Sequence, residues 1–154
     1  MKKLIVSSFL TLTMLLAFLV PVNVEVSASS NTLSTAEQII SEGKKYIGTA
    51  YRSGGMSPKG FDCSGFVVYT YKQITGKTLP RSSSGLFSSG EAVSKTELQK
   101  GDILVFNTSG RGASHVGIYI GDNKFIHSSS SGVKIDSLSH SYWSPKYMGA
   151  KRYL

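Results

Sequence analysis

The apolar residues of this chain change their spacing between its first and second halves. Between residues 34 and 76 they recur three or four positions apart, as on one face of an α-helix. From residue 114 onward they alternate with polar residues, which is typical of strands that bury one face. Helices followed by consecutive short strands predict an α+β domain with an antiparallel sheet.

The first predicted helix begins at a recognisable capping sequence. Ser34 and Glu37 have the spacing of a capping box, in which each residue binds the backbone N–H of the other. Apolar positions continue at helical spacing to Ile47. We therefore expect the helix to extend to Gly48, with Ile47 on its buried face.

A second helix follows a loop of glycine, serine and proline at residues 49–60. Asp62 can cap this helix, which we expect to begin at Cys63 and to end before Gly76. The serine-rich residues 82–89 contain two apolar positions and are expected to form a short helical turn. These three segments supply the helical layer of the predicted fold.

Five strands are expected in the second half of the chain. They lie at residues 103–106, 114–120, 124–128, 133–135 and 147–153. Gly-Asp-Asn at residues 121–123 is a tight-turn sequence, so the strands on either side of it are expected to pair antiparallel. Pairing centred on Asp122 places position 127 opposite position 117 and places position 115 opposite position 129.

The first 28 residues have the pattern of a secretory signal peptide. Lys2 and Lys3 precede an uncharged run over residues 4–20, and a small-x-small cleavage site ends at Ala28. The run is shorter than the ~20 residues that span a bilayer, which favours a cleaved signal over a membrane anchor. We therefore expect a secreted or cell-wall-associated protein without stable membrane insertion. It would consist of a short segment at 29–33 and one domain at 34–154.

The net charge bears on the partners. The whole chain carries a formal charge of +8, and removing Lys2, Lys3 and Glu25 with the signal lowers it to +7. A basic protein outside the cell favours anionic partners, with wall polymers and anionic lipid headgroups as the two candidates. Nucleic acid is not expected, because the charges are scattered and no ladder of aromatic residues is present for base stacking.

Cys63 is the only cysteine of the chain, so it cannot form an internal disulfide. Its expected position at a helix start favours the thiolate, because the N-terminal end of a helix dipole is positive. The thiolate is the nucleophilic form of cysteine. The alternative is a small buried packing residue, since free cysteine is among the most buried residue types.

Two histidines favour the catalytic interpretation. His115 and His127 lie on the same face of the predicted hairpin, which we expect to receive the helix tip that carries Cys63. A thiol hydrolase needs a nucleophile, a histidine to move the proton and a third group to orient that histidine. We assign these roles to Cys63, His115 and His127 in that order. The expected resting state is a Cys63 thiolate paired with a protonated His115.

Two other interpretations use the same three residues. A zinc site at Cys63, His115 and His127 lacks the close ligand pairs, second cysteine or nearby carboxylate typical of zinc proteins. No metal or cofactor is therefore expected. Purely structural histidines are the second alternative, which the pairing of both with a lone thiol disfavours. His140 is expected at the surface, and Trp143 is expected to pack rather than to bind a ligand.

Six sequence blocks resemble the NlpC/P60 family of bacterial cell-wall cysteine peptidases. They lie, in family order, at residues 51–55 (YRSGG), 62–67 (DCSGFV), 79–83 (LPRSS), 98–102 (LQKGD), 115–121 (HVGIYIG) and 125–127 (FIH). The resemblance implies a papain-like α+β fold and a catalytic set of Cys63, His115 and His127. It further implies hydrolysis of peptidoglycan stem peptides or muropeptides, typically between γ-D-glutamate and a diamino acid.

The resemblance also implies a substrate site. Tyr51 would line it, and Asp62 and Ser64 would help to bind the substrate, often at a free amino terminus when muropeptides are preferred. Residues 84–87 depart from the family pattern, in which members often carry a glutamine, so this wall of the cleft is not assigned. An amidase or acyltransferase on the same scaffold, or a non-catalytic wall-binding protein, remain alternatives. The sequence does not indicate the oligomeric state.

Overall fold

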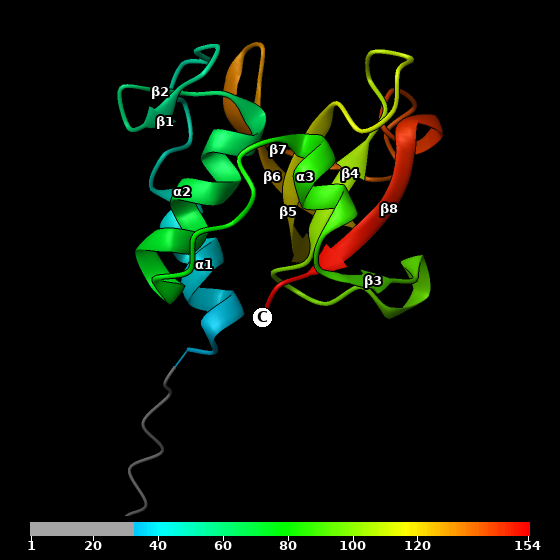
Figure 1. Cartoon of the computed structure of the whole chain (residues 1–154), viewed down its shortest axis with the longest axis horizontal. Coiled ribbons are helices and arrows are strands. Elements are labelled where there is room, and N and C mark those ends of the chain that lie inside the picture. Colours follow the sequence, from blue (N-terminus) through cyan, green and yellow to red (C-terminus); the bar gives the residue numbers. More distant parts are fainter. Residues whose placement is uncertain (1–32) are drawn as a thin grey trace, which may run out of the picture. The chain divides into compact units, whose positions relative to one another are not determined.

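Three α-helices lie against a six-stranded antiparallel sheet in the computed structural model, which describes residues 33–154 (Figure 1). The predicted signal peptide of residues 1–28 lies outside the described residues, as do residues 29–32. Across residues 33–154, each helix is too short or too polar to cross a lipid bilayer.

The helices precede most of the strands, as the α+β prediction requires. The elements are α1 (Thr35–Lys44), β1 (Met56–Ser57), β2 (Gly60–Phe61), α2 (Cys63–Thr75), α3 (Ser83–Ser88), β3 (Glu91–Val93), β4 (Ile103–Phe106), β5 (His115–Gly121), β6 (Lys124–Ser129), β7 (Gly132–Ser137) and β8 (Tyr147–Arg152). β1 and β2 form a separate two-stranded hairpin, and the large sheet has the order β3-β8-β4-β5-β6-β7. Every strand pair is antiparallel, which confirms the predicted fold class.

Helix α1 begins as predicted but ends earlier. The Ser34 side chain accepts a hydrogen bond from the Glu37 backbone, and the Glu37 side chain accepts one from the Ser34 backbone. The helix stops at Lys44 rather than at Gly48, and Ile47 is 51% exposed, so its predicted burial was wrong. From Lys45 to Ile47 the backbone N–H groups donate to carbonyls three residues back rather than four, and at Gly48, with a φ of 89°, the N–H donates instead to the Val133 carbonyl.

Helices α1 and α2 cover one face of the sheet. Phe66, Val67 and Tyr71 of α2 are buried in one apolar cluster with Val116 and Ile118 of β5. The helix is capped by the Asp62 side chain at its start and ends at Gly76, which has the left-handed φ of 70°. Burial of these side chains fixes α2 against strands β5 and β6 of the sheet.

A second apolar cluster covers the opposite face of the sheet. There Leu138 and Trp143, from the segment between β7 and β8, pack on Phe106 and Phe125. Phe125 also contacts the ring of His127, so the histidines point to this face. The body of α2 therefore packs on the opposite face, whereas its tip, which was expected to meet the histidine face, brings Cys63 to the cavity that His115 also lines. Both faces of the sheet are apolar, and sequence alternation does not say which of them the helices cover.

The β5–β6 hairpin has the predicted register. Ile118 pairs with Ile126, and Tyr119 pairs with Phe125. Continuing this register places Gly117 opposite His127. The two turn residues at 122 and 123 have φ values of 49° and 58°, a conformation that Asp and Asn tolerate well. A side chain at Gly117 would place its Cβ 3.0 Å from that of His127, so glycine leaves the space that the histidine occupies.

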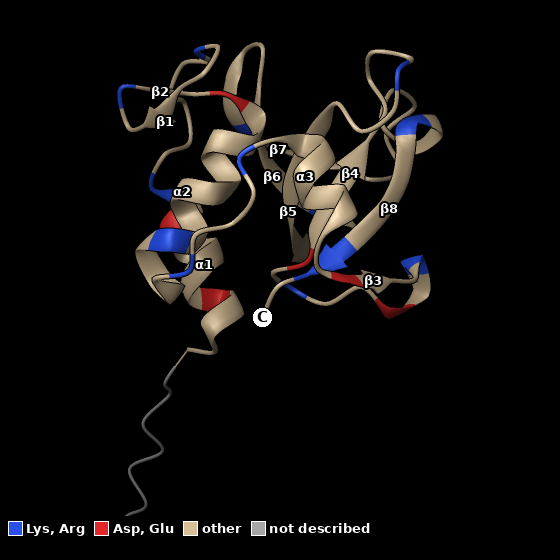
Figure 2. Cartoon of the chain, in the orientation of Figure 1, with Lys and Arg blue, Asp and Glu red and all other residues tan. Residues whose placement is uncertain are grey.

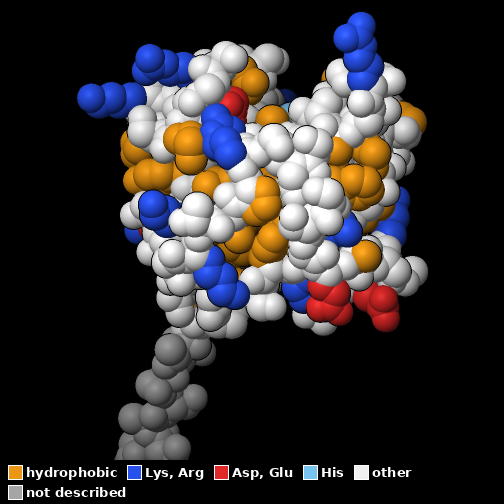
Figure 3. Space-filling view, in the orientation of Figure 1, with side chains coloured by type: hydrophobic (Ala, Val, Ile, Leu, Met, Phe, Trp, Pro, Cys, Tyr) orange, Lys and Arg blue, Asp and Glu red, His pale blue; other side chains and the backbone are white. Residues whose placement is uncertain are grey.

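Basic residues are distributed over the surface. In Figure 2, Lys and Arg occur on helices, loops and β8 rather than in one block. On the face shown in Figure 3, their side chains lie at separate points, some at the rim and some further in, and most of the visible acidic surface is at one corner near β3. The distribution matches the scattered charges of the sequence.

Candidate active site

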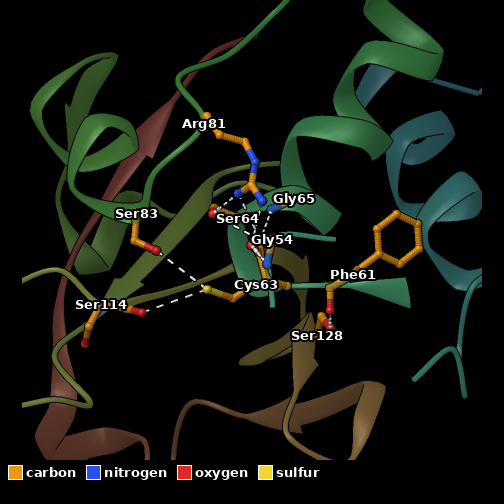
Figure 4. Close-up of polar contacts among 10 residues, drawn as sticks. Gly54, Phe61, Cys63, Ser64, Gly65, Arg81, Ser83, Ser114 and Ser128 are labelled. Carbon is orange, nitrogen blue, oxygen red and sulfur yellow. Dashed lines mark hydrogen bonds and ion pairs between the residues drawn. The ribbon is translucent and has the colours of Figure 1, made fainter. Parts of the chain in front are cut away.

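Cys63 is the first residue of helix α2, as predicted. Its side chain is 8% exposed, and its thiol lies 3.6 Å from the Ser83 hydroxyl and 3.9 Å from the Ser114 carbonyl oxygen (Figure 4). Ser114 directly precedes His115, so the sulfur lies beside the backbone that carries the candidate base. As the first residue of the helix, Cys63 has a backbone N–H without an intrahelical acceptor.

The turn before Cys63 is fixed by a close backbone contact. A Cβ atom on Gly65 would lie 2.0 Å from the Gly55 carbonyl oxygen, so only glycine fits at this position. Asp62 binds both sides of the contact, because its side chain accepts hydrogen bonds from the backbone N–H of Gly65 at 2.7 Å and of Gly54 at 3.0 Å. The start of α2 is thereby attached to the loop before it.

Arg81 pairs with Asp62 through two nitrogens, at 3.0 Å and 2.5 Å, and also donates to the Ser64 hydroxyl at 2.8 Å (Figure 4). Burial opposes the ionisation of Asp62, but hydrogen bonds from Arg81 and the Gly65 backbone outweigh it and hold the pKa of Asp62 below its ordinary value. The two residues predicted to bind substrate are therefore already engaged by an arginine.

The two histidines form a hydrogen-bonded pair. His115 Nε2 lies 2.8 Å from His127 Nδ1, and His127 Nε2 lies 3.0 Å from Asp136 Oδ2. Trp143 donates its indole N–H to the same carboxylate oxygen at 2.9 Å and stacks on the His115 ring. The chain of contacts runs from the cavity to His115, His127 and Asp136.

Burial sets the charge of this pair. It lowers the pKa of His115 to about 3, with the neighbouring His127 as the second cause. Burial also lowers the pKa of His127 to about 4, although Asp136 acts in the opposite direction. Both rings are thus neutral at neutral pH. This differs from the expected thiolate–imidazolium pair, since desolvation of the ring disfavours its charged form. Within residues 33–154, no hydrogen bond joins the thiol to His115.

A cavity of about 620 Å³ contains the candidate nucleophile and base. It is lined by Tyr51, Cys63, Thr108, Ser114, His115, Ser128, Ser129, Ser130, Ser131, Lys134, Asp136, His140, Tyr142 and Trp143. The structure thus brings Tyr51, Cys63 and His115 together around one space. His127 lies fully buried behind His115, and Asp62 and Ser64 are not among the lining residues.

Asp136 and Arg81 were missed as parts of the site. Lys134 and Asp136 alternate with the apolar Val133 and Ile135, which could have placed both polar residues on the histidine face. No local pattern pairs Arg81 with Asp62. His140 is exposed as expected but also lines the cavity, and Trp143 both packs and donates a hydrogen bond. Among the described residues, no three His, Cys, Asp or Glu side chains are grouped as metal ligands.

Comparison with known proteins identifies the family. A sequence model of the NlpC/P60 family matches residues 48–152 of this chain. The chain belongs to the NlpC/P60 family. The six blocks that resembled this family therefore lie in a true member, and the papain-like α+β prediction agrees with the structures of other NlpC/P60 domains.

Individual NlpC/P60 relatives are similar over most of the chain. The probable peptidoglycan endopeptidase LytE of Bacillus subtilis is 44% identical over 124 residues, covering 79% of this chain and 36% of the relative. The murein DD-endopeptidase MepH of Escherichia coli is 46% identical over 112 residues, which cover 69% of this chain and 41% of MepH. A crystal structure of a Bacillus cereus NlpC/P60 protein matches with a TM-score of 0.73 at 42% identity. The match covers 77% of this chain and 40% of the Bacillus cereus chain. The chain thus spans less than half the length of these relatives.

Proposed function

We propose that this domain hydrolyses amide bonds in the stem peptides of peptidoglycan, with Cys63 as nucleophile and His115 as base. The observation that carries the proposal is that the Cys63 thiol and the His115 ring line one cavity, with His127 hydrogen-bonded behind His115. The family membership, and the names of the relatives LytE and MepH, support peptidoglycan as the substrate class.

The first half of the reaction would form a thioester. The neutral His115 takes the thiol proton as the sulfur bonds to the substrate carbonyl carbon, and the carbonyl π electrons move to oxygen. The backbone N–H of Cys63 is a candidate donor to that oxyanion, worth about 3 kcal/mol where the geometry is right. When the oxyanion collapses, the C–N bond breaks and His115 gives its proton to the leaving amine.

The second half would release the acid. Water attacks the thioester carbon and gives a proton to His115, and the C–S bond then breaks. The proton returns from His115 to the thiolate, which restores the starting state. In both halves His115 must accept and then donate one proton, which suits a ring that is neutral at rest.

We propose the bond between γ-D-glutamate and the diamino acid as the site of cleavage, since the family typically cuts there. A D,D bond between cross-linked peptides is the second candidate, which the name of MepH favours. Because Arg81 engages both Asp62 and Ser64, we infer that these residues do not bind a free amino terminus in this protein. Peptides still attached to the glycan would then be suitable substrates.

The place of action follows from the same proposal. Peptidoglycan lies outside the cytoplasmic membrane, and the pattern of residues 1–28 supports export followed by cleavage after Ala28. The mature protein would be found in the medium or on the wall. Mass measurement of the protein recovered from these fractions would test it, and a chain that retained residues 1–28 would contradict it.

To test the proposal, purified peptidoglycan and soluble muropeptides are each digested with the protein of residues 29–154, and the masses of the products are measured. We expect new peptides that begin with the diamino acid. The Cys63→Ala variant should abolish their release, while the exposed Asp122→Asn variant should not. Release by Cys63→Ala would overturn the proposed nucleophile. Products cut after D-alanine would move the proposal to the D,D bond, and no release by the wild type would favour a non-catalytic wall-binding protein.

A further inference from the structure

We propose that Asp136 is a positioning residue that sets the tautomers of both histidines through its contact with His127. The inference rests on the proposed function for its catalytic meaning, although the tautomers themselves can be measured without a substrate. Asp136 lies on β7, beside the strand that carries His127, and its carboxylate faces the far side of that ring.

Three donors converge on one oxygen of Asp136. His127 Nε2 lies 3.0 Å from Oδ2, the Trp143 indole nitrogen 2.9 Å and the Lys134 ammonium 3.1 Å. Burial disfavours the charged carboxylate, but hydrogen bonds from Lys134 and Trp143 outweigh it and hold the pKa of Asp136 below its ordinary value. An ionised carboxylate can only accept hydrogen bonds, so the proton of His127 must be on Nε2.

The tautomer of His127 then determines that of His115. With its proton on Nε2, His127 presents a lone pair at Nδ1 to its partner 2.8 Å away. His115 Nε2 must therefore carry the proton of that hydrogen bond. Nδ1 of His115 is left as the only ring nitrogen that can accept a proton, and it belongs to the ring that lines the cavity with Cys63.

The opposite arrangement would disable the base. If His127 carried its proton on Nδ1, its Nε2 lone pair would face a carboxylate oxygen at 3.0 Å, and the two would repel. His115 would then accept at Nε2 and carry its proton on Nδ1, where it could not take the thiol proton. His127 is 0% exposed, and Asp136 is the one acceptor that the described residues offer to its Nε2.

Trp143 holds the same arrangement from the other side. Its ring lies parallel to that of His115, at 5.0 Å between centroids and 29° between planes, while its N–H fixes the Asp136 carboxylate. One side chain therefore limits the rotation of His115 and the position of the carboxylate that sets its tautomer.

The test compares Asp136→Leu and Asp136→Asn with Asp122→Asn as the matched control. Asp122 is exposed and lies at the hairpin turn, where Asn is well tolerated. We expect Asp136→Leu to lower kcat by about 100-fold and to change KM by less than threefold. Losses of this size are typical when a residue that hydrogen-bonds the far nitrogen of a functional histidine is removed. Asp136→Asn should retain most activity. The donors of His127, Trp143 and Lys134 all face the position of Oδ2, so the amide is expected to place its oxygen, rather than its NH₂ group, at that position.

Nitrogen chemical shifts of the histidine rings give the second readout, in the Cys63→Ala background. We expect His115 and His127 to be protonated at Nε2 in the protein that retains Asp136 and in Asp136→Asn. In Asp136→Leu we expect a changed tautomer. Unchanged tautomers in Asp136→Leu, or a kcat within threefold of the control, would overturn the inference. A wild type that shows the tautomers but cleaves no peptidoglycan would overturn the proposed function instead.

Discussion

Acid should unfold this protein through its two buried histidines. In the unfolded chain both titrate near 6.5, whereas burial lowers their folded-state pKa values to about 3 for His115 and about 4 for His127. Below pH 6.5 the unfolded state therefore binds more protons than the folded state, and stability falls as the pH falls. The contribution of the two neutral histidines to the free energy of unfolding is fully present above about pH 6.5. It is lost as the pH falls towards about 4 for His127 and about 3 for His115.

The size of the effect follows from the same values. At about pH 5 each histidine is mostly protonated in the unfolded chain and mostly neutral in the folded one, which costs about 2 kcal/mol each. The two together should lower the free energy of unfolding by roughly 4 kcal/mol between about pH 7.5 and about pH 5. A typical domain has only about 5–15 kcal/mol to lose. Asp62 and Asp136, whose pKa values are lowered, act only at lower pH.

Guanidinium unfolding followed by far-UV circular dichroism across this pH range measures the effect. His127→Gln removes one of the two titrating groups, so the slope of stability against pH should fall by about half. Gln73→Ala is the control, because this exposed residue carries no titratable group and its loss should leave the slope unchanged. A wild-type slope below about 0.5 kcal/mol per pH unit would refute the reasoning.

Four further predictions concern the hairpin, the helix cap, the substrate peptide and binding to the wall. Gly117→Ala should lower stability by about 1–3 kcal/mol and reduce activity, because the added methyl reaches the Cβ of His127; an unchanged melting temperature would contradict this. Ser34→Ala should cost about 1 kcal/mol in urea unfolding and leave kcat unchanged, since the capping box lies outside the site; an equal loss of kcat would show a wider role. Because Arg81 engages Asp62, acetylating the amino terminus of a substrate peptide should change kcat/KM by less than about threefold; a larger loss would restore amine binding. Activity on intact sacculi, but not on soluble muropeptides, should fall with added salt if the basic charge binds anionic wall polymers; equal responses would exclude that contribution.

Local patterns in the sequence predicted much of the fold and of the site. The cap at Asp62 and the terminal Gly76 placed Cys63 at the start of its helix, because capping depends on a few neighbouring residues. Pairing centred on Asp122 predicted the register in which position 127 lies opposite Gly117, and the structure reaches it through a two-residue turn followed by a register shift between Tyr119 and Gly121.

Long-range pairings could not be predicted in this way. Arg81 and Asp62 lie 19 positions apart, and no periodicity joins a loop arginine to a helix cap. Strand β3, with only Glu91–Val93, is too short to show alternation, and its pairing with β8 depends on the tertiary fold. Which face of the sheet the helices cover is decided by the packing of two apolar surfaces rather than by the pattern within either one.

The proposed base and its hydrogen-bonded partners come from one short stretch of the chain. His115, His127 and Asp136 all come from the consecutive strands β5, β6 and β7, whereas the sulfur arrives from α2, much earlier in the sequence. The meander can bring its own three side chains together, but thiol and imidazole meet only after the helical layer has docked. A chain in which α2 has not docked on the sheet would therefore lack the proposed pairing of thiol and imidazole, and activity would require both layers to be in place.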